Sequence, residues 1–141
     1  MKIIIDFIDQ KDQRYDTLGD WFTYRFENNE ELWQIKVTRQ RSIRHQLLIA
    51  IHELVEMMIC VHKGVDAAKV DEFDFRWKPR ITTNGVPIKE PGDDPNAPYY
   101  DAHQVATVVE RLMAMALDVH WPTYETSLDH PSMPSLPEIL G

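Results

Sequence analysis

The pattern of apolar and polar residues changes along the chain and predicts strands first and helices afterwards. Residues 2–8 are rich in isoleucine, which is typical of a strand. Residues 20–26 and 31–38 mix aromatic or β-branched residues with polar ones, and the polar turn 27–30 separates them, as in a hairpin. We therefore expect a small antiparallel sheet of three strands at the N-terminus.

A long helix is predicted after the hairpin. Ser42 is a suitable N-cap, and the run that follows it ends at Gly64, where a glycine commonly closes a helix in the left-handed conformation. Apolar residues cover a broad arc of the helical wheel, so the helix should be mostly buried. One narrow polar stripe remains, and His52, Glu53 and Glu56 contribute to it.

The next segment is predicted to be a short helix followed by a loop. Asp66 can cap a helix that continues through Phe73. Residues 76–98 contain five of the nine prolines, and Asn84-Gly85 is typical of a tight turn, so this segment is a loop or a small hairpin.

A second long helix is predicted from near Pro98 to about Val119, with Asp94 or Asn96 as its cap, and Trp121-Pro122 interrupts it. The proline-rich residues 129–141 are expected to form an extended tail. The chain is thus an α+β protein with one domain, residues 1–128, in which the sheet packs on two long helices.

Composition narrows the classes of function. The net charge of -8 repels a phosphate backbone, so no nucleic-acid partner is expected despite the basic residues between Lys36 and Arg44. No segment approaches the roughly 20 apolar residues that span a bilayer, so no membrane association is expected. The single cysteine, Cys60, excludes an internal disulfide and favours the cytoplasm. A protein or peptide is the expected partner, and the apolar residues of the tail allow an oligomer.

The polar stripes of the two long helices carry the candidate chemistry. His103 and Glu110 share one face of the second helix, as His52 and Glu56 do on the first. If the stripes face each other, the four side chains converge. Two imidazoles with one or two carboxylates suit zinc or another first-row divalent metal.

The spacing within His52-Glu53-Leu54-Val55-Glu56 assigns a role to each polar residue. Residues four apart lie above one another on a helix, so His52 and Glu56 can grip one ion, while Glu53 points aside towards a bound water as general base. His103 would complete a set of two histidines and one carboxylate, and Glu110 would orient a ligand or complete the shell. Such an ion lowers the pKa of its water to about 7.

Three other interpretations stay open. The stripes can be the solvent face of amphipathic helices. The same residues can form a structural metal site or a buried polar network in a non-catalytic, phage-type accessory protein. Magnesium held by Glu53, Glu56 and Glu110 would instead indicate a nucleotide hydrolase, although the histidines favour zinc. Asp74 and either Asp93 or Asp94 can contact the residues that bind a metal without binding it themselves. Alternatively, they are ordinary surface carboxylates.

With these motifs assembled, the chain resembles a family of uncharacterised phage and bacterial proteins. The matching residues are 14–21 (Arg-Tyr-Asp-Thr-Leu-Gly-Asp-Trp), 52–56, Phe73-Asp74, 90–99 (Glu-Pro-Gly-Asp-Asp-Pro-Asn-Ala-Pro-Tyr), and His103 with Ala106, Thr107 and Glu110. The resemblance reaches to about Glu125 and implies a shared fold.

More loosely, a sheet followed by a His-Glu helix looks like a minimal zincin, the fold of many metallopeptidases. The His-Glu-x-x-His motif of that fold places two histidines on zinc and makes the glutamate the general base. Here Glu56 stands where zincins carry the second histidine. The likeness implies a metal-dependent hydrolase of peptide or amide bonds.

Overall fold

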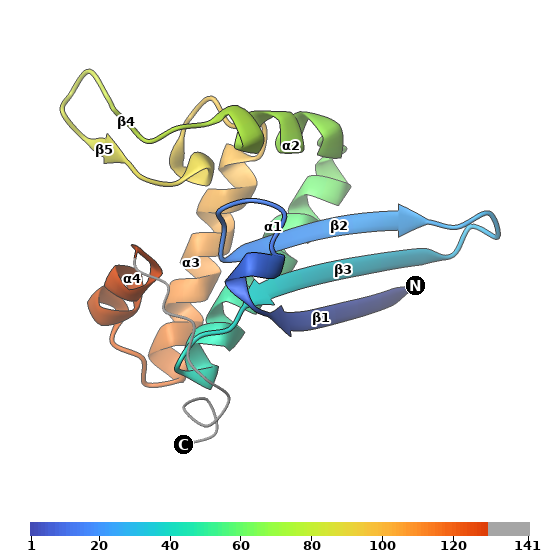
Figure 1. Ribbon diagram of the computed structural model, residues 1–141, viewed down its shortest axis with the longest axis horizontal. Helices are drawn as coiled ribbons and strands as arrows, with labels where there is room; N and C mark the ends of the chain where they lie inside the picture. The colour runs from blue at the N-terminus through green and yellow to red at the C-terminus, as the bar shows by residue number, and fades with distance from the viewer. Residues whose placement is uncertain (130–141) are drawn as a thin grey trace.

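The computed structural model describes residues 1–129 and confirms the α+β architecture (Figure 1). A central helix, α1 (Ile43–Lys63), contacts strands of the sheet as well as the second long helix, α3 (Tyr100–Ala116). The other elements are β1 (Lys2–Ile8), η1 (Gln10–Asp12), β2 (Gly19–Arg25), β3 (Glu31–Thr38), α2 (Ala67–Arg76), β4 (Arg80–Ile81), β5 (Pro87–Ile88), η2 (Pro91–Asp93) and α4 (Trp121–Asp129).

The three-stranded sheet is mixed, which corrects the prediction of an antiparallel one. Its order is β1-β3-β2, so β3 lies in the centre. The β2–β3 hairpin is antiparallel as predicted, but β1 pairs with β3 in parallel, from Lys2 opposite Leu32 to Ile8 opposite Thr38. The segment between β1 and β2 crosses the end of β3, so β2 starts at the opposite edge of the sheet and β3 returns between the two.

Helix α1 begins and ends where the sequence predicts. The Ser42 side chain accepts a hydrogen bond from the backbone N–H of His45, and Gly64 closes the helix with φ 67°. This left-handed conformation is easy for glycine, which has no Cβ. Leu48, Met57 and Cys60 are fully buried, so Cys60 is a core residue, as is usual for a free cysteine on a helix.

Helix α2 and the loop after it also follow the predicted pattern. Asp66 caps α2 by accepting from the N–H of Ala68, and β4 and β5 form a small hairpin with Gly85 at φ 78° in its turn. Asp94, however, is not the cap of α3, because its carboxylate accepts hydrogen bonds from the side chains of Trp77 and Arg80. Tyr99 holds the N-cap position, and its side chain makes no capping hydrogen bond to the helix.

The C-terminal part contains a helix that the sequence pattern did not predict. Helix α3 ends at Ala116, before the expected Val119, and α4 begins at Trp121. Pro122 lies in the first turn of α4, where proline is tolerated because the N–H that it lacks has no partner in the helix. The predicted tail lies outside the described residues, apart from Asp129, the last residue of α4.

The outer face of α3 is apolar and exposed, whereas its polar stripe is buried. Val105, Val108, Leu112 and Met115 are between 48% and 75% exposed, while His103 is only 8% exposed and Glu110 only 5%. The helix therefore turns its polar stripe towards the protein interior. None of the helices in residues 1–129 has the length and hydropathy needed to cross a membrane.

Candidate metal centre

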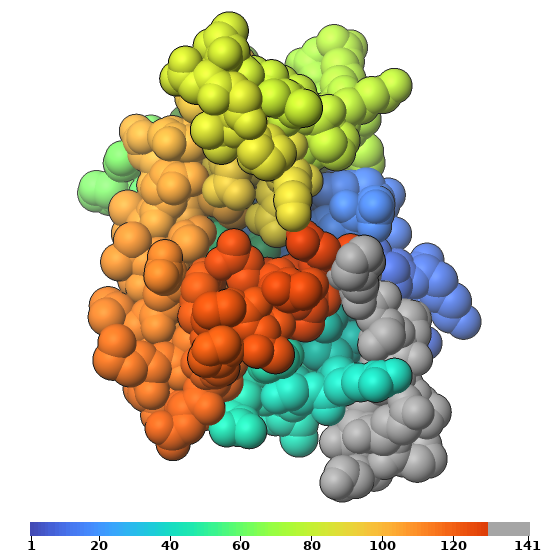
Figure 2. Space-filling view, turned by 90° about the vertical axis from the view of Figure 1, so that its left-hand side faces the viewer, coloured from blue at the N-terminus to red at the C-terminus, as the bar shows by residue number. Residues whose placement is uncertain are grey.

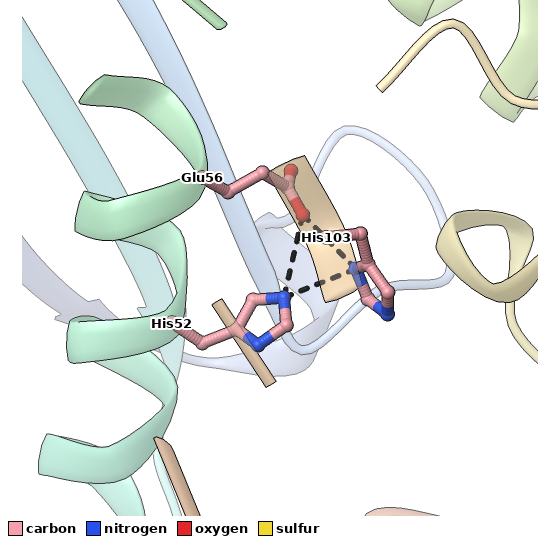
Figure 3. A group of neighbouring side chains, drawn as sticks. All are labelled: His52, Glu56 and His103. Atoms are coloured by element: carbon pink, nitrogen blue, oxygen red, sulfur yellow. Dashed lines mark hydrogen bonds and ion pairs between the residues drawn. The ribbon is translucent and has the colours of Figure 1, made fainter. Parts of the chain in front are cut away.

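Three predicted ligands meet in a buried group between α1 and α3 (Figure 3). Nε2 of His52 lies 3.3 Å from Oε2 of Glu56 and 3.1 Å from Nδ1 of His103. The third side of the triangle, from Nδ1 of His103 to Oε2 of Glu56, measures 3.0 Å. All three residues are between 5% and 8% exposed. The group can therefore hold a metal ion with one atom from each residue.

A carboxylate fixes the orientation of the His52 ring. Nδ1 of His52 lies 3.0 Å from Oε1 of Glu110, and the Tyr124 hydroxyl of α4 donates to the other oxygen of Glu110. An ionised carboxylate only accepts hydrogen bonds, so Nδ1 must carry the proton. In the neutral ring, Nε2 then directs its lone pair towards Glu56 and His103. Such carboxylate–histidine pairs are typical of metal sites.

The His103 ring is held in the same way from η2. Its Nε2 lies 3.3 Å from Oδ1 of Asp93, which leaves Nδ1 free to face His52 and Glu56. Gly92 packs directly against the ring, and a Cβ at this position would overlap the imidazole. The loop thus supplies both a proton acceptor and the space that the ring occupies.

Glu56 is also oriented by a neighbour, which binds one carboxylate oxygen while the other faces the two histidines. The indole Nε1–H of Trp21, from β2, donates to Oε1 of Glu56 at 3.0 Å, and Oε2 faces the two histidines. The sheet therefore positions Glu56, just as Glu110 of α3 positions His52 and Asp93 of η2 positions His103. In each of the three residues, the atom on the far side has a partner and the atom on the near side faces the triangle.

Burial and hydrogen bonds shift the pKa values of the three residues. Burial alone would lower the pKa of His52, but the hydrogen bonds to Glu110 and Glu56 raise it well above its ordinary value. Burial is likewise outweighed at His103, where Asp93 and Glu56 raise the pKa to about 9. At Glu56, burial opposes ionisation, yet the two histidines lower the pKa to about 2. Without an ion, protons hold this network together, so a metal has to displace them.

Glu53, the predicted general base, lies beside the triangle. It lines a cavity of about 770 Å³ together with His52, Glu56 and His103. Its carboxylate packs against Gly19 at the start of β2, where a Cβ would overlap it. Burial and the nearby Glu56 charge raise its pKa well above the ordinary value. No hydrogen bond or ion pair of residues 1–129 involves this carboxylate, so it is free to act on a molecule in the cavity.

The remaining candidate residues divide into those near the triangle and those away from it. Glu110 was expected as a ligand or as an orienting group, and it contacts the far nitrogen of His52 rather than the triangle. Asp93 and Asp74 line the cavity, whereas Asp94 binds Trp77 and Arg80 outside it. Glu90, Asp93 and His103 form a second group that could hold an ion, but both acids are about half exposed.

Several residues that shape the site had no predicted role, namely Gly19, Trp21, Gly92 and Tyr124. The first three lie within segments 14–21 and 90–99, two of the motifs that carry the resemblance to the phage and bacterial family. Both segments line the cavity beside the His52–Glu56 helix. Their unusual composition was therefore the available signal. Tyr124 belongs to the unpredicted helix α4 and gave no such signal.

Comparison with known proteins identifies no relative of this chain. Searches of protein-family models, of curated proteins and of solved structures found no match to the chain. The resemblance to phage and bacterial proteins and to zincins therefore stays a prediction from the motifs. The class that fold and site define is an α+β protein with a buried His/Glu/His group able to hold a metal ion.

Proposed function

We propose that the protein is a zinc-dependent hydrolase of peptide or amide bonds, related in design to the zincins. In this proposal His52, Glu56 and His103 hold the ion, Glu53 is the general base, and Glu110 orients His52. The observation that carries it is the arrangement of the three ligand residues. Their near atoms form a triangle, and their far atoms are each fixed by a partner from another element.

The size of the triangle fits zinc. Bonds of about 2.0–2.1 Å in a tetrahedral zinc site place neighbouring ligand atoms ~3.3 Å apart. The three separations here are 3.0, 3.1 and 3.3 Å, so an ion fits with little movement of the side chains. Three protein ligands leave the fourth position of a tetrahedral site open, which is the arrangement of catalytic rather than structural zinc sites.

The position of Glu53 favours a catalytic over a structural role for the same site. A zinc ion held there would polarise a substrate carbonyl and lower the pKa of a water to about 7. Glu53 follows His52 on α1 and lines the cavity beside the triangle. Its pKa is raised by burial, as is common for carboxylates that exchange protons near neutral pH. It would accept the proton of the attacking water and later pass it to the leaving amine.

A non-catalytic protein is the second candidate, and one observation favours it. The polar atoms of the triangle already have hydrogen-bond partners without an ion, so a buried polar network or a structural metal in a phage-type accessory protein would need the same residues. A magnesium-dependent nucleotide hydrolase is less favoured, because two of the three ligand atoms are imidazole nitrogens and magnesium prefers oxygen.

The first experiment is elemental analysis of protein purified without chelator and without a metal-affinity tag. We expect about one zinc per chain, and loss of that zinc in His52→Ala and His103→Ala. The matched control is His62→Ala, since His62 is an exposed histidine on the same helix. Absence of any bound transition metal, even after incubation with zinc, would contradict the proposal and leave a magnesium site or a polar network without a metal.

The second experiment separates ligand from base. Glu53→Gln should keep stoichiometric zinc and lose hydrolysis of a mixed peptide library by at least about 100-fold, the usual contribution of a general base. His52→Ala should lose both zinc and activity. If Glu53→Gln loses zinc to the same extent as His52→Ala, Glu53 is itself a ligand and the assignment of roles is wrong.

A further inference from the structure

A second polar group lines the same cavity and is not used by the proposed reaction. It consists of Asp74 on α2, Tyr15 in the segment before β2, and Tyr99 at the start of α3. The Tyr15 hydroxyl donates to one oxygen of Asp74 at 3.0 Å, and the Tyr99 hydroxyl donates to the other at 2.6 Å. Three segments that are distant in sequence therefore converge on one carboxylate.

Asp74 has no cationic partner among the described residues, unlike the two buried aspartates Asp20 and Asp94. Asp20 is bound by Arg14, and Asp94 is bound by Arg80. Within residues 1–129, neither Asp74 nor Glu53 forms an ion pair. A carboxylate kept only for structure is normally paired when it is buried, as Asp20 and Asp94 are. The Asp74 carboxylate thus lines the cavity without an ion-pair partner from the described part of the chain.

The carboxylate retains capacity for another donor. An ionised carboxylate offers about four acceptor positions, and the two phenols occupy one on each oxygen. Burial raises the pKa of Asp74 to about 6 although Tyr99 and Tyr15 oppose the shift, so most of the group is ionised at pH 7. An ammonium group of a bound molecule could therefore bind at a remaining acceptor position of Asp74.

We infer that Asp74, Tyr15 and Tyr99 form a subsite for a protonated amine of the substrate, so that the proposed hydrolase acts on cationic peptides. This inference rests on the proposed function and adds the class of substrate to it. A lysine side chain and a free peptide N-terminus offer the same ammonium group. Phosphorylated or acidic groups are disfavoured at this subsite, because the Asp74 carboxylate would repel their charge.

The test uses the zinc-loaded full chain and pairs of fluorogenic peptides that differ by one charge. One peptide carries lysine and its partner carries norleucine, and each is made with a free and with an acetylated N-terminus. We expect kcat/KM to favour the ammonium-bearing member by at least about tenfold, the smallest ratio expected for a hydrogen bond to a charged group. The acetylated pair reports on the side chain, and the norleucine pair reports on the N-terminus.

The variants assign the preference to the subsite. Asp74→Asn should reduce the ratio to about one, and Tyr15→Phe and Tyr99→Phe should lower it partly. The matched control is Glu72→Gln, which should leave the ratio unchanged, because Glu72 is an exposed acid of the same helix that binds Arg76 and does not line the cavity. If Asp74→Asn does not fold, the peptide pairs with the wild-type protein still decide, because equal rates for charged and neutral peptides would overturn the inference.

A binding measurement distinguishes failure of this inference from failure of the proposed function. Butylamine binding is followed by NMR in wild type and in Asp74→Asn. If no peptide is hydrolysed but butylamine binds wild type and not the variant, the subsite stands and the hydrolase proposal fails. If peptides are hydrolysed with no preference for charge, the hydrolase proposal stands and the subsite fails.

Discussion

Two glycines set the positions of the two side chains that the proposed reaction needs most. Gly19 gives room to the Glu53 carboxylate, and Gly92 gives room to the His103 ring. Neither glycine has the positive φ of Gly64 or Gly85. Their role is therefore to let another side chain pack against the backbone, not to allow a special backbone conformation.

The two glycines lead to opposite predictions for zinc and for hydrolysis. Gly92→Ala should displace the His103 ring and weaken zinc binding about 10–100-fold, as loss of a supporting contact does in metal sites. Gly19→Ala should displace Glu53 instead, keep zinc and lower hydrolysis. Zinc affinity is measured by competition with a chromophoric chelator. Equal zinc affinity in the two variants would contradict the prediction.

Glu110 is predicted to act through His52. Glu110→Gln removes the negative charge that holds the proton on Nδ1 of His52, so zinc affinity should fall about 10–100-fold while the stoichiometry at saturating zinc stays at one. Tyr124→Phe, which removes the hydrogen bond to the other oxygen of Glu110, should have a smaller effect in the same direction. A stoichiometry that falls with Glu110→Gln would make Glu110 a ligand.

Asp74 is predicted to make stability depend on pH. Its pKa in the folded protein is about 6, above the ordinary 3.8, so the folded state holds the proton more tightly than the unfolded state does. The resulting stabilisation is full below about pH 4 and is lost as the pH rises through about 6. The free energy of unfolding of wild type should therefore fall relative to Asp74→Asn by roughly 1–3 kcal/mol between pH 4 and 7.

Urea unfolding of both proteins at a series of pH values, with chelator present throughout, measures this difference. Asp12→Asn serves as a control, because Asp12 is an exposed carboxylate of η1. A constant difference between wild type and Asp74→Asn across the pH range would show that the Asp74 carboxyl is not perturbed by burial.

At the scale of elements, the site lies where α1, α3, β2 and α4 come together, and α1 also packs directly against α3 and β2. Helix α1 supplies His52 and Glu56, α3 supplies His103 and Glu110, β2 supplies Trp21, and α4 supplies Tyr124. An ion bound to α1 and α3 would cross-link them through three short bonds. Hydrogen bonds among His52, Glu56 and His103 also join the two helices directly.

Zinc is therefore expected to stabilise the fold. With zinc at 1,000 times its dissociation constant, the added free energy of unfolding is about 4 kcal/mol, and the melting temperature should rise by roughly 10 °C or more. The rise should disappear in His103→Ala and persist in His62→Ala. Differential scanning fluorimetry with and without zinc measures it. An equal rise in wild type and His103→Ala would place the stabilising ion elsewhere.

At the scale of the whole molecule, residues 1–129 contain the sheet, both long helices and the complete candidate site. The last described helix, α4, contributes Tyr124, whose hydroxyl donates to Glu110, so it belongs to the same folded unit as the site. The sequence after residue 129, which lies outside the described residues, carries Pro131, Pro134 and Pro137.

A chain truncated after Asp129 is predicted to keep its melting temperature within about 2 °C, since free termini usually contribute little to stability. Its mass in solution should fall only by that of the residues removed. Melting and light scattering are measured side by side for the two lengths. A larger drop in melting temperature, or dissociation into smaller species, would show that Met133, Leu136, Ile139 or Leu140 packs against this or another copy of the chain.

Much of the fold was predictable because its signals are local. The caps at Ser42, Gly64 and Asp66 depend on the backbone and side chains of a few neighbouring residues. The hairpin depends on two short runs and the turn between them. Helix α4 was missed because Trp121-Pro122 reads as an interruption, although a proline in a first turn is compatible with a new helix.

The sequence by itself determined that His52 and Glu56 share one helix face and that His103 and Glu110 share another, because helical periodicity fixes relative direction within an element. Only the tertiary structure decided which atoms meet. Crossing of the helices brought Nδ1 of His103 to the triangle and turned Glu110 to the far side of His52. The direction of β1, the hydrogen bond from Trp21 and the pairing of Asp74 with two tyrosines depend on contacts between distant segments, and no local pattern encodes them.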